Sequence, residues 1–254
     1  HYPKDFVAVA DPLSVVGTVV VEASPWVEDN QWVLDLAKDN PSIVGFIGNL
    51  RLGVAEFATD LKRFSDNPLF RGVRLGERIL ADGLGQRAFE KDLQRMGEQH
   101  LTMDVLGGPA LVPNVVRAAK LAPNLKIVID HLPFGAWDND VAAMRTALTE
   151  VAALPNVFAK VSNVARRVND RLVDDPTFYR PGLDCLWDLF GADRVLFGSN
   201  WPVSKRVASY TTLHRIVMDY ANSKGAAAAE QFGWKNSQTA YGWQVRGAAK
   251  SLGK

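Results

Sequence analysis

Polar side chains that can bind or activate a small substrate stand at the ends of several hydrophobic, β-branched runs of this 254-residue chain. The carboxylates can accept protons, the cations can hold an anion or stabilise an oxyanion, and a histidine can act as acid or base or bind a metal. The carboxyl ends of parallel strands meet at one edge or one face, so these side chains are expected to converge there. The set comprises Glu22, Ser24, Asn49, Arg51, Arg74, Asp104, Asp130, His131, Lys160, Ser162, Ser199, Asn200 and Trp201.

His131 is the histidine whose position favours a functional role, because it stands near the end of a hydrophobic run. The alternation of a strand places Ile129 and His131 on one face and Asp130 on the other. An imidazole at a strand end can bind a metal or orient a carbonyl group, although a lone histidine is often structural. The remaining histidines are interpreted as surface or packing residues: His1, His100 and His214.

Two cations, Arg74 and Lys160, also end predicted strands, and two hypotheses fit them equally. Inward cations at the mouth of a barrel suit the binding of a carboxylate or the stabilisation of an oxyanion. Alternatively, they form ion pairs with Glu22 or Asp104. These two acids would serve as general bases if burial raised their pKa values, but the neutralisation of the cations is the slightly favoured role.

Tryptophans in the loops after strands are candidates for the wall of a substrate pocket. Trp26, Trp137 and Trp201 occupy such loops, where an aromatic ring either shapes a pocket or caps the core. The sequence does not discriminate between these roles, and Trp201 is retained as a substrate-binding candidate.

The elements that must position these residues alternate along the whole chain. Short β-branched runs are followed by amphipathic ones, the pattern of repeated βα units around a parallel sheet. Buried helical stripes are expected at Phe57, Leu61 and Phe64, and similarly at Phe89, Leu93 and Met96. Ser24-Pro25 predicts a helix start, and the Pro/Asn turns at 40–41, 122–124 and 154–156 predict stops before strands. The predicted strands are 17–23, 43–50, 72–75, 101–106, 126–132, 157–161 and 195–198.

Seven βα units of this size favour an α/β fold of the (β/α)8 TIM-like barrel type with its first strand missing from this chain. An open, doubly wound sheet has the same local pattern and is the alternative. No glycine-rich phosphate loop follows the first predicted strand, where Val-Glu-Ala-Ser-Pro stands at 21–25, and this favours the barrel. Residue 1 is His rather than Met, and no strand precedes the helix expected at 5–10, so we expect the chain to begin inside a domain.

Composition narrows the class of protein. Hydrophobic residues make up 47% of the chain and charged residues 22%, so one α/β domain over 1–254 is expected. Lys+Arg 29 and Asp+Glu 28 nearly cancel, which predicts neither nucleic acid nor an anionic membrane as a partner. The single Cys185 can form no internal disulfide, and the chain shows no signal-peptide pattern or bilayer-spanning stretch, so a cytoplasmic protein is expected.

Three segments taken together resemble the amidohydrolase-2 family of barrel hydrolases. They are 195–203 (Val-Leu-Phe-Gly-Ser-Asn-Trp-Pro-Val), 129–133 (Ile-Asp-His-Leu-Pro) and 156–162 (Asn-Val-Phe-Ala-Lys-Val-Ser), and their order and spacing match as well. The similarity extends from about Thr18 to Trp243. It is greatest to the branch that contains sugar-lactone hydrolases and 2-pyrone-4,6-dicarboxylate lactonases.

The resemblance implies a site at the C-terminal face, with an HxH pair ending the first strand, a later histidine on the sixth and an aspartate ending the eighth. His131 matches the sixth-strand histidine. The HxH pair has no counterpart, because its strand would lie upstream of residue 1. We therefore predict no firmly bound cofactor, and a divalent metal such as zinc, with His131 as a ligand, only if the upstream strand exists.

Asn200 stands where the family pattern Gly-Ser-Asp-Trp-Pro has its aspartate. A carboxylate can take a proton from the attacking water and ligate a metal as an anion, whereas a neutral amide does neither well. Either the mechanism is altered or the activity is reduced. Asn200 can still orient water or a carbonyl group, with His131 or Asp104 as the base.

The first functional hypothesis is hydrolysis of the ester bond of a small carboxylated lactone, in which water attacks the ring carbonyl. The partner is then a small anionic substrate, and self-association as a homo-oligomer stays open. The residues assigned to catalysis are His131, Asn200 and Asp104, and those assigned to substrate binding are Arg74, Lys160, Glu22 and Trp201.

Two other hypotheses remain. Non-oxidative decarboxylation in the same superfamily ranks lower, because it relies on a complete metal site. A catalytically impaired barrel that binds a small anion is consistent with the replaced aspartate and the missing ligands. Assays of ring opening across a lactone panel separate this binder from the hydrolase.

Overall fold

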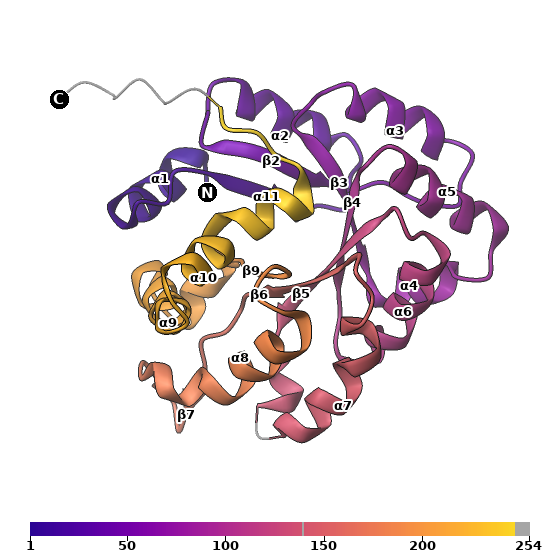
Figure 1. The fold of residues 1–254 in the computed structure, drawn as a ribbon. Helices are drawn as coiled ribbons and strands as arrows, with labels where there is room; N and C mark the ends of the chain where they lie inside the picture. Colours follow the sequence, from indigo (N-terminus) through magenta and orange to yellow (C-terminus); the bar gives the residue numbers. More distant parts are fainter. Residues whose placement is uncertain (139, 247–254) are drawn as a thin grey trace.

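Seven strands form one parallel sheet in a computed structural model, which describes residues 1–138 and 140–246 (Figure 1). They follow one another in the order of the sequence, β1-β2-β3-β4-β5-β6-β9, and each neighbouring pair is parallel. The strands are β1 (Thr18–Val21), β2 (Ile43–Gly48), β3 (Phe70–Gly76), β4 (Thr102–Leu106), β5 (Lys126–Leu132), β6 (Val157–Val161) and β9 (Val195–Phe197).

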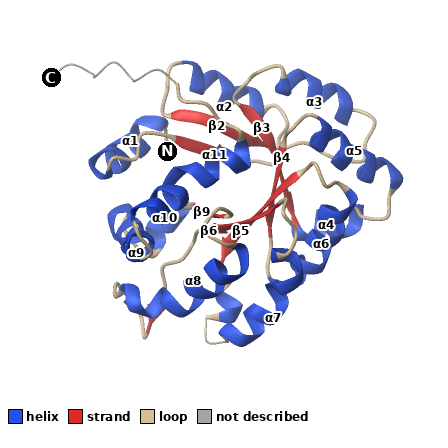
Figure 2. Cartoon of the chain, in the orientation of Figure 1, coloured by secondary structure: helices blue, strands red, loops and turns tan. Residues whose placement is uncertain are grey.

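The sheet curls into the wall of a barrel with the helices outside it (Figure 2). A doubly wound sheet reverses its strand order at a switch point, and the order here never reverses, so the open alternative is excluded. Within 1–138 and 140–246, β1 and β9 are the two edges of the sheet and do not pair with each other. The predicted barrel with one strand fewer is confirmed.

The helices lie around the strands and carry the expected buried stripes (Figure 2). In α3 the side chains of Phe57, Leu61 and Phe64 are buried, and α5 buries Phe89, Leu93 and Met96 in the same way. The helices are α1 (Pro3–Ala10), α2 (Asp29–Lys38), α3 (Phe57–Ser65), α4 (Glu77–Gly83), α5 (Arg87–Glu98), α6 (Val112–Leu121), α7 (Val141–Ala152), α8 (Pro176–Phe190), α9 (Tyr210–Ser223), α10 (Ala226–Glu230) and α11 (Asn236–Tyr241).

Local side-chain chemistry sets several helix ends. Asp140, Asp175 and Ser209 precede α7, α8 and α9, and each accepts a hydrogen bond from a backbone N–H of the first turn. The predicted stops are confirmed, because α2, α6 and α7 end at Lys38, Leu121 and Ala152, shortly before the Pro/Asn turns.

Two local features differ from the sequence-based expectation. Ser24-Pro25 does not start a helix: α2 begins at Asp29, and the Ser24 hydroxyl accepts the Trp26 N–H in a turn. A small hairpin of β7 (Arg167–Val168) and β8 (Arg171–Leu172) was not predicted. Its loop residues Asn169 and Asp170 both have positive φ, the conformation of a two-residue type I′ turn.

The interior of the barrel and the layer under the helices are separate apolar clusters. Ile47, Val128, Phe158 and Leu196 fill the interior together with Tyr241. Strand β2 is buried at all of its residues, and its hydrophobic run is continuous. Both features are expected for a parallel strand covered on both faces. The larger cluster packs the outer faces of the strands against α2 to α10.

The segment around α11 closes the amino end of the barrel. Figure 1 shows α11 running across the ring of strands. Thr102, at the start of β4, donates its hydroxyl to the Ala240 carbonyl, and Arg71 and Lys126, near the starts of β3 and β5, donate to carbonyls of the same segment. The opposite, carboxyl end is therefore the open rim.

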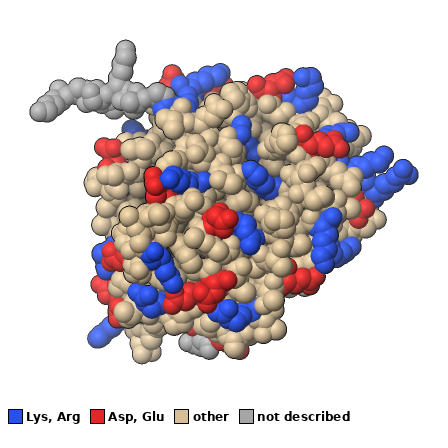
Figure 3. Space-filling model, viewed as in Figure 1, with Lys and Arg blue, Asp and Glu red and all other residues tan. Residues whose placement is uncertain are grey.

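The strands from both described ranges share one sheet, and the extent of a single domain over 1–254 stays a prediction. Within the described part of the chain, none of the helices has the length and apolarity to cross a bilayer. Acidic and basic side chains are interspersed on the face shown in Figure 3.

Candidate active site

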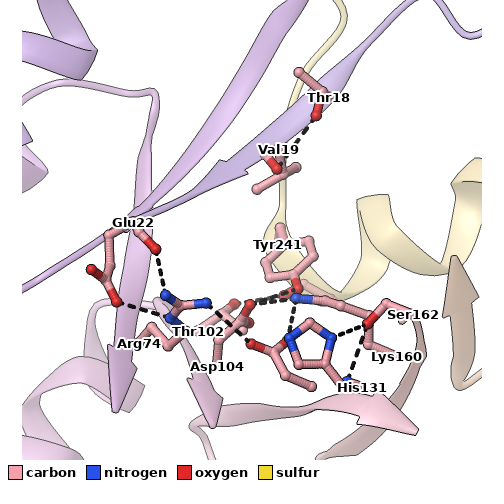
Figure 4. A network of polar contacts seen from close by, with 12 residues as sticks. Thr18, Val19, Glu22, Arg74, Thr102, Asp104, His131, Lys160, Ser162 and Tyr241 are labelled. Carbon is pink, nitrogen blue, oxygen red and sulfur yellow. Dashed lines mark hydrogen bonds and ion pairs between the residues drawn. The ribbon is translucent and has the colours of Figure 1, made fainter. Parts of the chain in front are cut away.

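His131 contacts the next strand at the carboxyl rim. Its Nδ1 lies 2.7 Å from the hydroxyl oxygen of Ser162, and its backbone N–H donates to the same oxygen at 3.1 Å (Figure 4). Ser162 directly follows β6 and is only 2% exposed. His131 has φ of 65°, an unusual left-handed conformation for a non-glycine residue, which turns its ring out of the strand's alternation.

Lys160 lies between two buried carboxylates. Its Nζ is 2.5 Å from Asp104 Oδ2 and 2.6 Å from Asp130 Oδ1. The Tyr241 hydroxyl reaches Asp104 from the closed end of the barrel at 3.2 Å. The Lys160 side chain fits because residue 198 is glycine, where a Cβ would come within 2.9 Å of the lysine Cδ.

Arg74 connects Lys160's carboxylates to the first strand. Its Nε donates to Glu22 Oε1 at 2.8 Å and its Nη2 donates to the Glu22 carbonyl (Figure 4). Its Nη1 lies 3.9 Å from Asp130 Oδ2. The side chains of Arg74 and Glu22 are 18% and 17% exposed, whereas Asp104 and Asp130 are almost completely buried. We name these five groups, Glu22, Arg74, Asp130, Lys160 and Asp104, the charge chain.

The pKa values along the charge chain follow from burial and charge. Burial raises the pKa of Asp104 to about 7; Lys160 opposes this rise and Asp130 adds to it. Burial alone would lower the pKa of Lys160, but the Asp104 and Asp130 carboxylates outweigh it and raise that pKa well above its ordinary value. Burial lowers the pKa of His131, so its imidazole is neutral at pH 7.

Asn200 is tied to the same rim. Its Nδ2 lies 3.3 Å from Asn163 Oδ1, one residue after the serine that contacts His131. Three neighbouring strands, β5, β6 and β9, thus end in or near non-glycine residues with positive φ: His131, Asn163 and Asn200. Strained backbone of this kind clusters at functional sites, so the rim is the best candidate for one.

The side chains of residues 1–138 and 140–246 do not form a metal site. In the described ranges, no group of three or more His, Cys, Asp and Glu side chains lies close enough to hold an ion. The Lys160 ammonium occupies the space between Asp104 and Asp130, and His131 already uses Nδ1 on Ser162. The donor set therefore does not fit zinc, which needs about three protein ligands in a catalytic site.

The structure places His131, Lys160 and Asn200 in or just after three neighbouring strands, and it gives two other predicted residues a different role from the one assigned. The Trp201 ring packs against His1 and Phe6, which is the core-capping role weighed for it, rather than standing free over the rim. Asp104 is fully buried and held by Lys160, so it is a counter-ion and cannot contact a substrate as a base. Of the two roles weighed for it, neutralisation fits the geometry.

The expected alternation in β5 also needs correction. Asp130, predicted on the face opposite His131, points into the barrel toward Lys160, while Ile129 faces the helix layer. The left-handed backbone of His131 then returns its ring to the rim, so Asp130 and His131 serve the same site.

Three residues of the site escaped the sequence-based assignment. Asp130 and Ser162 stand at predicted strand ends but were given no role, and the strand-end position was the signal available for both. Tyr241 carries no local signal, because it reaches Asp104 from 137 residues further along the chain.

The chain is similar in sequence to a known protein family and to two named enzymes. A family model described as Amidohydrolase matches residues 2–243. An L-fucono-1,5-lactonase of Burkholderia ambifaria is 30% identical over 208 residues, covering 80% of this chain and 70% of that protein. An L-fucono-1,5-lactonase of Burkholderia multivorans is 28% identical over 232 residues, covering 85% of this chain and 77% of that protein.

Solved structures share the fold. An amidohydrolase of Burkholderia multivorans with bound zinc superposes with a TM-score of 0.85 and 23% identity, covering 96% of this chain and 89% of that one. A protein assigned as a 2-pyrone-4,6-dicarboxylic acid hydrolase, from Pseudomonas putida, has a TM-score of 0.71 and 23% identity, covering 96% and 88%. At these identities the likeness supports the barrel fold alone.

Proposed function

Because the chain belongs to the amidohydrolase family, we propose that it is a hydrolase that opens a small lactone at the carboxyl rim of its barrel. The named activity of two relatives is the hydrolysis of a 1,5-lactone, and the resemblance noted in the sequence leads to the same branch. The observation that carries the proposal is the convergence of His131, Asn200 and the charge chain on one rim.

His131 is proposed to polarise the lactone carbonyl. Its ring is neutral at pH 7 and stands at the rim, where a hydrogen bond to the carbonyl oxygen would stabilise the oxyanion that forms when water attacks. Asn200, bonded to Asn163 across the neighbouring strand end, is proposed to orient the reactants through its amide. An amide cannot take the water's proton, so another group must act as the base.

Glu22 is the carboxylate proposed for that role. Of the three acids in the charge chain it is the most exposed, and one of its oxygens accepts the Arg74 guanidinium while the other accepts the Ser24 N–H. The water oxygen bonds to the carbonyl carbon as its proton passes to Glu22. The ring C–O bond then breaks, and Glu22 returns the proton to the departing ring oxygen.

The charges at the rim indicate which lactones are accepted. The expectation of a carboxylated substrate rested on Arg74 and Lys160, and both cations are paired with carboxylates. Each cation of the charge chain thus already has a carboxylate partner within the protein, which favours a lactone bearing hydroxyl groups. A carboxylated lactone is the second candidate, because Arg74 is partly exposed and can exchange Glu22 for a substrate carboxylate.

A lactone panel tests the proposal. Neutral sugar 1,5-lactones and 2-pyrone-4,6-dicarboxylate are incubated with the enzyme, and acid release is followed by pH-stat. We expect turnover of at least one neutral lactone and a loss of about a hundredfold or more in the His131→Asn variant. The matched control is His100→Asn, an exposed histidine that also has positive φ and lies outside the rim. Saturable binding without any ring opening would support the binder instead.

Metal content tests the donor set separately. The side chains described here do not form a zinc site, so we expect purified protein to retain no stoichiometric metal after dialysis against a chelator. A zinc signal that equals the protein concentration after this treatment would contradict the assignment of the rim as a metal-free site.

A further inference from the structure

The hydroxyl of Ser162 makes two hydrogen bonds to one residue. Its oxygen accepts the backbone N–H of His131 at 3.1 Å and lies 2.7 Å from the imidazole Nδ1. Ser162 is 2% exposed, and among the described residues its hydroxyl contacts no other polar atom. The proton of this hydroxyl therefore has one acceptor within reach, the Nδ1 of His131.

The location of that proton decides which imidazole nitrogen carries hydrogen. A buried hydroxyl that donates to no acceptor is costly, so the Ser162 O–H is directed at Nδ1. Nδ1 must then offer its lone pair, and in a neutral imidazole the remaining hydrogen is on Nε2. The reverse arrangement, with Nδ1 donating to the serine, would leave the buried hydroxyl proton without a partner.

We propose that Ser162 is a positioning residue that holds neutral His131 in the Nε2–H tautomer, so that His131 acts as a hydrogen-bond donor and not as a base. The tautomer follows from the Ser162 geometry alone, while the donor's role toward a lactone carbonyl rests on the proposed function. Of the two roles that a histidine can take here, His131 is thereby assigned that of the electrophile that donates to the carbonyl, and not that of the base.

The other end of the ring is available for this role. The buried side-chain atoms without a hydrogen-bond partner in the described chain are Asp104 Oδ1 and Ser204 Oγ. Nε2 of His131 also has no partner there but is not among these buried atoms, so it is open to solvent at the rim. Asp130, Lys160 and Arg74 are the charged groups that act on the ring, and burial keeps the ring neutral among them.

Nitrogen NMR on the full chain tests the tautomer directly. The protein is labelled with ¹⁵N-histidine, and two-bond correlations at pH 7.5 identify the protonated ring nitrogen of each of the four histidines. The His131 signal is assigned as the one lost in His131→Asn, a substitution that tolerates the positive φ. We expect the Nε2–H pattern for His131. An Nδ1–H pattern in the unmodified protein would overturn the proposal, whatever the activity toward lactones.

Variants of Ser162 separate positioning from a structural role. Ser162→Ala removes the donor, and we expect the His131 spectrum to show a mixture of tautomers, while kcat falls about tenfold with little change in KM. Ser162→Thr keeps the hydroxyl and should restore the Nε2–H pattern. A Ser162→Ala protein that is merely less stable, with an unchanged tautomer, would overturn the proposal. A clear Nε2–H pattern with no turnover of any lactone would leave the tautomer standing and remove only the proposed function.

Discussion

Strand β3 carries one arginine near each end, and the two make opposite kinds of contact. At the amino end, Arg71 donates to the backbone carbonyls of Tyr241 and Gly242 in the segment that closes the barrel. At the carboxyl end, Arg74 donates to the Glu22 carboxylate and lies near Asp130. The same contrast holds for the two ends of the whole barrel.

Cations at the closed end satisfy the carbonyls of helix ends and turns. Arg246 donates to the carbonyls of Ala37, Asn40 and Ile43, from the last turn of α2 to the start of β2. Arg194 donates to carbonyls near the start of β6. Burial lowers the pKa values of Arg71, Lys126 and Arg194. Arg71 adds to this effect at Lys126, and Asp193 offsets only part of it at Arg194. These contacts do not depend on a titrating partner, which suits a role in stability.

Cations at the open rim instead share buried carboxylates. The pKa of Lys160 is raised there because Asp104 and Asp130 outweigh its burial. A chain of opposite charges with a protonatable member responds to a ligand or to pH, whereas cations on carbonyls do not. The same residue types thus satisfy backbone carbonyls at one end, and at the other they form the site that we propose for the reaction.

The largest effect is expected from Lys160→Met. The substitution leaves Asp104 and Asp130 facing each other without the ammonium, and the free energy of unfolding should fall by about 3 to 5 kcal/mol, together with the loss of activity. Urea denaturation measures the change. The double variant Asp104→Asn with Lys160→Met removes one of the two charges and should recover part of the stability. Equal stability of the single and double variants would mean that repulsion between the Asp104 and Asp130 carboxylates is not the cause of the loss.

Glu22→Gln tests the reactive side of the comparison. The amide keeps the size of the side chain but takes no proton from water, so kcat should fall about a hundredfold, while the melting temperature changes little. The control is Glu28→Gln, which removes an exposed acid paired with Arg63 and should leave kcat unchanged. Full activity in Glu22→Gln would exclude this carboxylate as the base.

Arg71→Met tests the structural side. It removes the hydrogen bonds to Tyr241 and Gly242, and the free energy of unfolding should fall by about 2 kcal/mol, while kcat/KM keeps its value. Denaturation and lactone kinetics on the same preparation check both statements. If kcat/KM fell tenfold or more, the two ends would not be independent.

The smallest effect is the pH dependence of stability. The pKa of Asp104 in the folded protein is raised to about 7 from its ordinary value of 3.8, so the folded state binds more protons between these values. Its contribution to stability is present below pH 4 and is lost as the pH rises through 7. Between pH 6 and 7 the loss should be about 1 kcal/mol, and it should be absent in Asp104→Asn. A wild-type protein that gained stability over this range relative to the variant would contradict the assignment.

Local pattern was sufficient to predict the strands, the buried stripes of α3 and α5, and the strand-end positions of His131 and Asn200. Periodicity and Pro/Asn turns depend on residues a few positions apart, and the ends of parallel strands meet wherever the sheet closes. A local pattern can also mislead, as at Ser24-Pro25, which was predicted to start a helix. The Ser24 hydroxyl instead accepts the Trp26 N–H in a turn, and α2 starts later, at Asp29.

What the sequence by itself determined is therefore the barrel, its family and the rim at which polar residues gather. Only the tertiary structure decided which polar side chains pair with each other. Lys160 forms an ion pair with Asp104, 56 residues away in the sequence, and Tyr241 donates a hydrogen bond to the same acid from 137 residues away. Hydrogen bonds and ion pairs act over a few ångströms, and their strength does not depend on how far apart the two residues lie in the sequence. The role of each polar residue thus depends on the closed ring of strands that brings it to its partner.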